Sequence, residues 1–270
     1  MSNIVTYDIK SDFDKTKNIL IPYFLPFNGL ITCNGLENII KDGPNIIIIN
    51  HPGVGKDIAL LLKVYERQLF FTASDFVFSK ETILNKFKGY CGNKYGGRFK
   101  YDILKPLANS FSDFLPSKMK KYEMIPISLK SDLSREQVVQ SLKKSIDMAK
   151  DYLKKERAIV FFQMNTDISK KYSKEYAVSK YHNYLFKFHN TVSRIIHELY
   201  KGGLYIPITP VAFYGGEGIN PFRKIVMNIG EPVYLESIKE NNSIPEFTNI
   251  LEQKVANLLI DVGISRDIMK

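Results

Sequence analysis

Short apolar runs alternate along the chain with longer stretches whose apolar residues recur every three or four positions. Seven runs predict β-strands: Leu30–Cys33, Asn45–Ile49, Leu69–Ala73, Glu123–Ser128, Ala158–Phe162, Leu204–Ala212 and Lys224–Ile229. Several are continuous rows of Ile, Val and Phe, a pattern typical of strands that are buried on both faces. The longer stretches predict helices at Asp57–Arg67, Glu81–Lys88, Tyr101–Phe114, Arg135–Lys155, Tyr176–Tyr200 and Pro245–Val262.

Strands that alternate with helices predict an α/β fold, here a single domain with a mostly parallel mixed central sheet covered by helices on both faces. The clearest helix is Arg135–Lys155, because Ser134 and Gln137 have the spacing of a capping box at its start. In such sheets ligands bind beyond the carboxyl-terminal ends of the strands, which is where candidate chemistry is expected.

No linker, repeat or low-complexity tract divides the sequence, so we expect an N-terminal segment at 1–28 and one α/β domain at 29–270. The apolar segment Asn18–Thr32 contains Pro22 and Pro26 and is too short to span a bilayer as a helix. Two roles stay open for it, an interfacial contact with a membrane and packing on the core of the domain.

Composition narrows the function classes. The 270 residues include 38 Lys and Arg against 28 Asp and Glu, a formal net charge of +10 that suits a phosphorylated substrate, nucleic acid or an anionic membrane face. The alternative is that the lysine-rich composition does not reflect any ligand.

Cys33 and Cys91 cannot form a disulfide framework or a cysteine-rich zinc site, and the N-terminus lacks a signal-peptide pattern. We therefore expect a cytoplasmic protein, soluble or peripheral on a membrane.

The most informative segment follows the second predicted strand. That strand ends at Asn50, His51 leaves its tip, and Asp57 opens a helix after a turn that contains two glycines. Such a histidine and carboxylate are the parts of a general base and its orienting group, since the carboxylate accepts the Nδ1 proton and leaves Nε2 to take another. The alternative is that Asp57 only caps the helix and His51 is only a turn residue.

The same turn superficially resembles a phosphate-binding loop of the G-x-x-x-x-G-K-[ST] type. However, Asn50 occupies the first glycine position and Asp57 the Ser/Thr position, where an acid would repel phosphates. We therefore set aside a nucleotide triphosphatase.

Asn50, His51, Pro52 and Asp57 resemble the first motif of the glycerophospholipid acyltransferase superfamily, which includes glycerol-3-phosphate and lysophosphatidic acid acyltransferases. Three further segments are similar to its later motifs, in family order: Ile125–Lys130, Ile159–Thr166 and Ile206–Phe213. Asn228–Val233 is similar to the closing strand and turn of the family. The resemblance extends from about residue 29 to 262 and implies an acyltransferase-like domain.

Two features depart from the family pattern. Five residues separate His51 from Asp57 where four are usual, and the glycines of the turn can absorb the extra one. In the third motif Met164 replaces the usual acid and Asp167 the usual arginine, while Thr166 persists. An aspartate cannot replace an arginine at a phosphate, and the candidate substitutes are Lys130, Arg98 and the pair Lys170/Lys171.

The resemblance implies transfer of a fatty acyl group from acyl-CoA or acyl carrier protein to a hydroxyl of a glycerol-phosphate, lysophospholipid or similar acceptor. It implies His51 as general base oriented by Asp57, and substrate binding by Lys130, Asn165, Thr166 and Arg98. No cofactor and no metal is expected. The expected partners are the thioester donor, the alcohol acceptor and an anionic membrane surface, with the protein peripheral on the inner face of a membrane.

Two other hypotheses stay open. The altered third motif fits a catalytically silent homologue that binds lipid, membrane or a protein partner. The interleaved lysines and aromatic residues of Lys170–Phe188 could form a nucleic-acid face, but at helical spacing the rings are better explained as one buried stripe. Nucleic acid is therefore not expected as a partner, and His182, His189 and His197 in this region are interpreted as structural.

Overall fold

The computed structural model describes residues 14–15, 17–18, 21–22, 25, 30–51, 56–74, 78–81, 83–85, 105–106, 109–110, 112–113, 116–117, 122–127, 134–162, 185, 188–215, 224–235 and 243–261. Its strands are β1 (Ile31–Asn34), β2 (Asn45–Ile49), β3 (Leu69–Ser74), β4 (Ile125–Ile127), β5 (Ala158–Phe162), β6 (Ile208–Tyr214) and β7 (Ile225–Ile229). Every strand expected from the apolar runs is present, and β2 and β5 have the predicted bounds.

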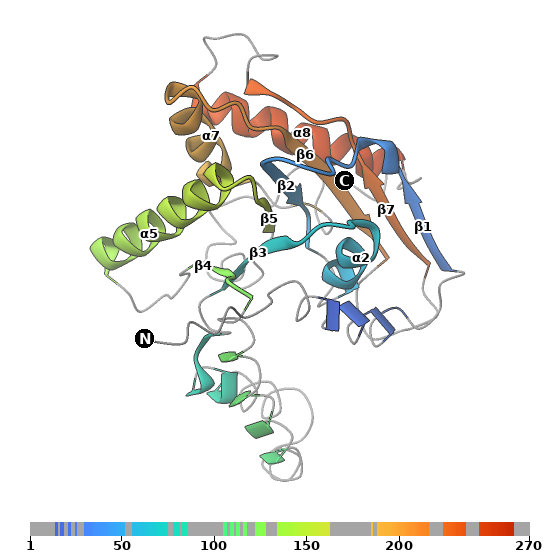
Figure 1. Ribbon diagram of the computed structural model, residues 1–270, viewed down its shortest axis with the longest axis vertical. Helices are drawn as coiled ribbons and strands as arrows, with labels where there is room; N and C mark the ends of the chain where they lie inside the picture. Colours follow the sequence, from blue (N-terminus) through green and yellow to red (C-terminus); the bar gives the residue numbers. More distant parts are fainter. Residues whose placement is uncertain are drawn as a thin grey trace, which may run out of the picture. The chain divides into compact units, whose positions relative to one another are not determined.

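The chain comprises two compact units, Met1–Leu69 with Met148–Lys270, and Phe70–Asp147. In the first unit the strands form a mixed sheet in the order β1-β7-β6-β2-β5, and in the second unit β3 pairs with β4 (Figure 1). The pairs β1–β7, β2–β5, β2–β6 and β3–β4 are parallel, and β6–β7 is antiparallel. The predicted α/β fold with a mostly parallel sheet is confirmed.

In the first unit, β2 lies between β5 and β6, with Ile46 opposite both Ile159 and Ile208. All five residues of β2 are buried although successive side chains point to opposite faces, so both faces of the sheet are covered at this strand. The helix α8 (Ile244–Asp261) packs against β6 and β7, and α7 (Thr191–Lys201) packs against α8 (Figure 1). The second unit contains the β3–β4 pair, and the Ser145 hydroxyl donates to the carbonyl of Pro126 there.

The helices α2 (Lys56–Val64) and α5 (Arg135–Lys154) were predicted to within a few residues. The capping box of α5 is confirmed, because the N–H of Ser134 donates to Gln137 Oε1 at 2.9 Å and the N–H of Gln137 to Ser134 Oγ at 3.3 Å. A capping box that we did not predict begins α8, where the N–H of Ser243 donates to Glu246 Oε2 at 2.7 Å. The helices expected at Glu81–Lys88 and Tyr101–Phe114 and the segment 1–28 are described only in part; Glu81 and residues 83–85 are helical, and the boundary at residue 28 stays a prediction.

The single helix expected over Tyr176–Tyr200 is wrong. Leu185 and residues 188–190 are not helical, and α7 begins only at Thr191. The N–H of Phe188 donates to Glu252 Oε2 on α8 at 3.0 Å, so a distant side chain takes the hydrogen bond that a continuing helix would have used. Leu185 and Phe188 are both buried, which agrees with a packing role for the apolar positions described here.

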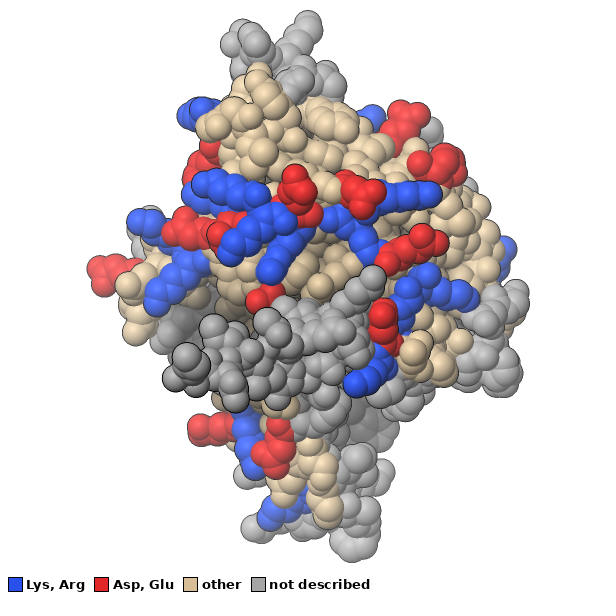
Figure 2. All heavy atoms as spheres, in the orientation of Figure 1, with Lys and Arg blue, Asp and Glu red and all other residues tan. Residues whose placement is uncertain are grey.

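Basic and acidic side chains are interleaved on the face shown in Figure 2 and do not separate into large areas of one sign. Ion pairs join Lys150 to Glu198 at 2.6 Å and Lys155 to Asp151 at 2.7 Å. Within the described ranges, none of the helices has both the length and the apolar content needed to cross a bilayer.

Candidate active site

The candidate site lies where three parallel strands of the first unit end. His51 follows β2 by two residues, Phe162 is the last residue of β5, and Phe213 is the penultimate residue of β6. Because these strands are parallel, their carboxyl-terminal ends meet at one edge of the sheet. The helix α2 begins at Lys56, so Asp57 lies in its first turn.

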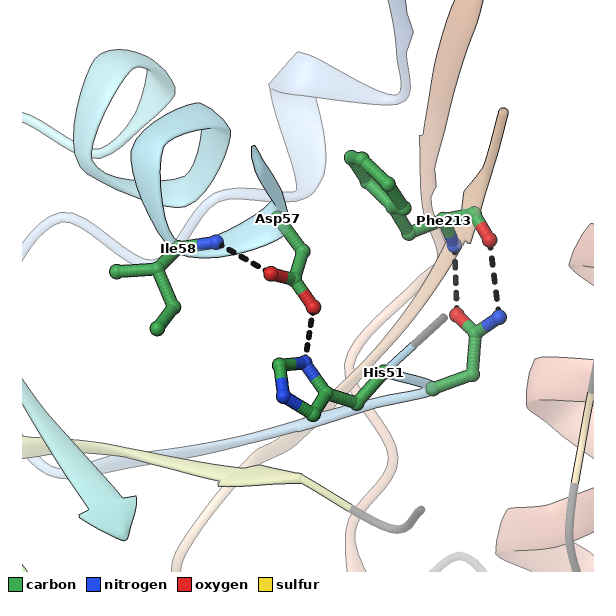
Figure 3. A network of polar contacts seen from close by, with 5 residues as sticks. His51, Asp57, Ile58 and Phe213 are labelled. Carbon is green, nitrogen blue, oxygen red and sulfur yellow. Dashed lines mark hydrogen bonds and ion pairs between the residues drawn. The ribbon is translucent and has the colours of Figure 1, made fainter. Parts of the chain in front are cut away.

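The structure brings His51 and Asp57 into direct contact through His51 Nδ1 and Asp57 Oδ2 (Figure 3). The other carboxylate oxygen, Oδ1, accepts the N–H of Ile58 at 2.9 Å. As the second residue of α2, Asp57 is not its N-cap, and its two oxygens bond to a backbone N–H of the first turn and to the imidazole. An ionised carboxylate only accepts, so His51 donates from Nδ1 and Nε2 is the nitrogen able to accept a proton.

Two opposing effects act on the pKa of His51. Burial lowers it, while the negative charge of Asp57 and the hydrogen bond to that carboxylate raise it, and together the two raising effects are larger. The net pKa of His51 lies above its ordinary value. His51 thus holds a proton more firmly than an isolated imidazole, which is the property of a stronger base.

Phe162 restricts the imidazole ring from another direction. The centroids of the two rings are 4.4 Å apart and their planes are inclined at 39°. Sequence reasoning missed this contact because it depends on β5 lying beside β2, where Phe162 pairs with Ile49.

Asn50, the residue before His51, is completely buried. Its side-chain Nδ2 donates to the carbonyl of Phe213 at 2.9 Å, and its Oδ1 accepts the N–H of Phe213 at 2.7 Å (Figure 3). One amide side chain therefore binds both backbone groups of a residue on the neighbouring strand. In the sequence, Asn50 was recognisable only as part of a motif, and no role could be assigned to it.

The other predicted site residues, Lys130, Asn165, Thr166 and Arg98, lie outside the described residues, as do Lys170 and Lys171. Their roles in substrate binding stay predictions. The described part of the chain contains no group of three or more His, Cys, Asp or Glu residues placed to hold a metal ion.

Fold and site together define an α/β protein with a histidine–carboxylate pair at the carboxyl-terminal edge of a mostly parallel sheet. No protein-family model matches the chain, and no curated protein matches it either. Among solved structures, the chain is similar to the crystal structure of the 1-acyl-sn-glycerophosphate (LPA) acyltransferase, PlsC, from Thermotoga maritima. The TM-score is 0.50 and the sequence identity 16%, over 95% of this chain and 81% of that chain. At this identity the comparison supports an acyltransferase-like fold, as expected from the sequence.

Proposed function

We propose that the protein is an acyltransferase that moves an acyl group from a thioester to the hydroxyl of a glycerolipid-type acceptor. The observation that carries the proposal is the contact between His51 Nδ1 and buried Asp57, at the strand ends of a fold similar to that of an LPA acyltransferase. This contact leaves Nε2 as the proton acceptor, which is the arrangement that general-base catalysis at a hydroxyl requires.

In the proposed reaction, His51 Nε2 takes the proton from the acceptor hydroxyl as its oxygen attacks the thioester carbonyl. The new carbon–oxygen bond forms, the carbon–sulfur bond breaks, and the proton held by His51 passes to the departing thiolate. Asp57 keeps the ring in the required tautomer and stabilises the transient imidazolium. Base catalysis of this kind contributes about 10²–10⁴-fold in rate, and positioning of the two substrates adds to it.

The donor is proposed to be acyl-CoA or acyl carrier protein, and the acceptor a glycerol-phosphate, a lysophospholipid or a related alcohol. Lys130, Asn165, Thr166 and Arg98 are the proposed acceptor-binding residues. Asp167 stands where related sequences usually have an arginine, which favours an acceptor whose phosphate is held by Lys130 or an acceptor without a phosphate. The proposed place of action is the surface of an anionic membrane.

The test is release of free thiol from acyl-CoA or acyl carrier protein in the presence of a panel of phosphorylated and unphosphorylated acceptors. Acceptor-dependent release that is lost in His51→Ala supports the proposal. The matched control is His197→Ala, since His197 lies on α7 and its Nδ1 bonds to the carbonyl of Ser193 at 2.8 Å. The control is expected to keep its activity.

A second candidate function is that of a silent homologue that binds lipid or a protein partner, favoured by the altered third motif. No thiol release with any donor and acceptor, together with tight binding to anionic vesicles, would support that function and overturn the enzymatic one. Activity that survives in His51→Ala would overturn the assignment of the base.

A further inference from the structure

We propose that Asn50 is a positioning residue for His51: by holding the end of β2 to the backbone of Phe213, its side chain sets the geometry at which the imidazole meets Asp57. The inference rests on the proposed function only for its catalytic consequence. Whether the His51–Asp57 contact depends on Asn50 can be tested without any assay of acyl transfer.

The ladder between β2 and β6 ends before it reaches Asn50 and Phe213. The last pair in this register is Ile49 with Val211, two residues before Phe213. On its other side β6 continues along β7, with Phe213 opposite Met227 and Tyr214 opposite Val226. The end of β6 is thus held by β7, whereas β2 has no further residue in this ladder.

Both backbone polar groups of Phe213 point towards Asn50. The N–H and C=O of one strand residue point to the same side, and here both bond to Asn50. The amide of Asn50 has one acceptor and a donor in one plane, which matches this pair of groups as a peptide unit would. Asn50 and Phe213 are both completely buried, so water cannot readily replace either bond.

His51 and Asp57 are attached to different parts of the backbone. Asp57 is fixed by α2, whose residues Ala59–Leu62 are buried and whose first turn donates the Ile58 N–H to Asp57. His51 is not part of any helix or strand, and its backbone is bonded covalently to that of Asn50. The contact between them therefore depends on where the end of β2 lies, and the two Asn50 bonds help to fix that position beyond the last strand pairs at Ile49.

A matched control exists at the opposite end of the same two strands. Thr209 on β6 donates from Oγ1 to Asn45 Oδ1 on β2 at 3.2 Å, and both residues are completely buried. Thr209→Val removes this link with little change in shape. It tests how much a buried polar link between β2 and β6 matters when it lies far along the strand from His51.

The experiment compares the full-length wild type with Asn50→Ala and Thr209→Val by NMR of the His51 ring and by thiol-release kinetics. In Asn50→Ala we expect the Nδ1 proton resonance of His51 to shift or broaden and the pKa of His51 to fall, since burial persists while the Asp57 contact weakens. We expect kcat to fall by about 10- to 100-fold, with KM for the thioester changed less than about twofold. Thr209→Val should leave the resonance, the pKa and kcat as in the wild type.

An unchanged His51 resonance and pKa in folded Asn50→Ala would overturn the inference, and so would equal changes in Thr209→Val. If Asn50→Ala does not fold, Asn50→Ser replaces it, because a hydroxyl can keep one of the two bonds, and smaller changes in the same directions are expected. A wild type with no transferase activity would remove the proposed function but leave the NMR comparison decisive for Asn50.

Discussion

Asp57 is completely buried, while His51, whose Nδ1 it contacts, keeps 30% of its side chain exposed. The orienting carboxylate is thus shielded from water and the imidazole remains accessible to a substrate. Charges attract each other more strongly away from water, so this placement strengthens the hold of Asp57 on the ring.

Replacing Asp57 by asparagine should lower the pKa of His51. The substitution removes the negative charge that raises this pKa and keeps the burial that lowers it. Turnover should fall by about 10²–10⁴-fold, because an amide does not fix the Nδ1–H tautomer or stabilise the imidazolium. NMR titration of the His51 ring measures the pKa, and thiol release measures the turnover. A His51 pKa equal to that of the wild type would contradict the contact.

The dependence of kcat/KM on pH should also reflect the raised pKa of His51. The base acts in its neutral form, so activity is lost as the pH falls through the pKa of His51. Because that pKa is raised, half of the activity should be lost at a pH above about 6.5, the ordinary value for histidine. In Asp57→Asn the acid limb of the residual activity should move to lower pH. An acid limb at the same pH in both proteins would exclude His51 as the titrating group.

Lys130→Ala should raise KM for phosphorylated acceptors and leave KM for unphosphorylated ones unchanged. The expected increase is about 10- to 100-fold, since a charge-assisted bond to phosphate contributes roughly 1.5–3 kcal/mol. Initial rates over a range of acceptor concentrations measure it. Lys143→Ala, which removes an exposed lysine of α5, is the matched control and should behave as the wild type. A similar KM increase for both acceptor classes would show that Lys130 does not bind the phosphate.

Alanine substitutions at Gly35 and Gly43 distinguish the destabilisation caused by a left-handed backbone angle from that caused by a close contact of the added Cβ. Gly35 has φ +73° and Gly43 φ +75°, but an added Cβ would lie 1.9 Å from the carbonyl oxygen of Ile229 at Gly35 and would meet nothing within 4 Å at Gly43. Gly43→Ala should destabilise the protein by about 1–2 kcal/mol. Gly35→Ala should cost clearly more, because its backbone must move away from β7. Urea denaturation measures both, and equal losses would contradict the close approach.

The sequence sufficed for features that depend on nearby residues. The continuous apolar runs at β2 and β5 placed those strands correctly, and the short interval from His51 to Asp57 at a strand-to-helix transition predicted their contact. Features that depend on distant residues could not be predicted. The ring contact of His51 with Phe162 requires the strand order, and the non-helical backbone at Phe188, just before α7, bonds to Glu252, 64 residues away.

The His51–Asp57 contact joins a residue just past the end of one rigid element to the first turn of the next. The contact depends on where these two element ends lie, so a connection one residue longer than usual still permits it. A sequence search that demands four intervening residues would pass over this chain. A search for a histidine after a central parallel strand, with a carboxylate in the first turn of the following helix, would find it.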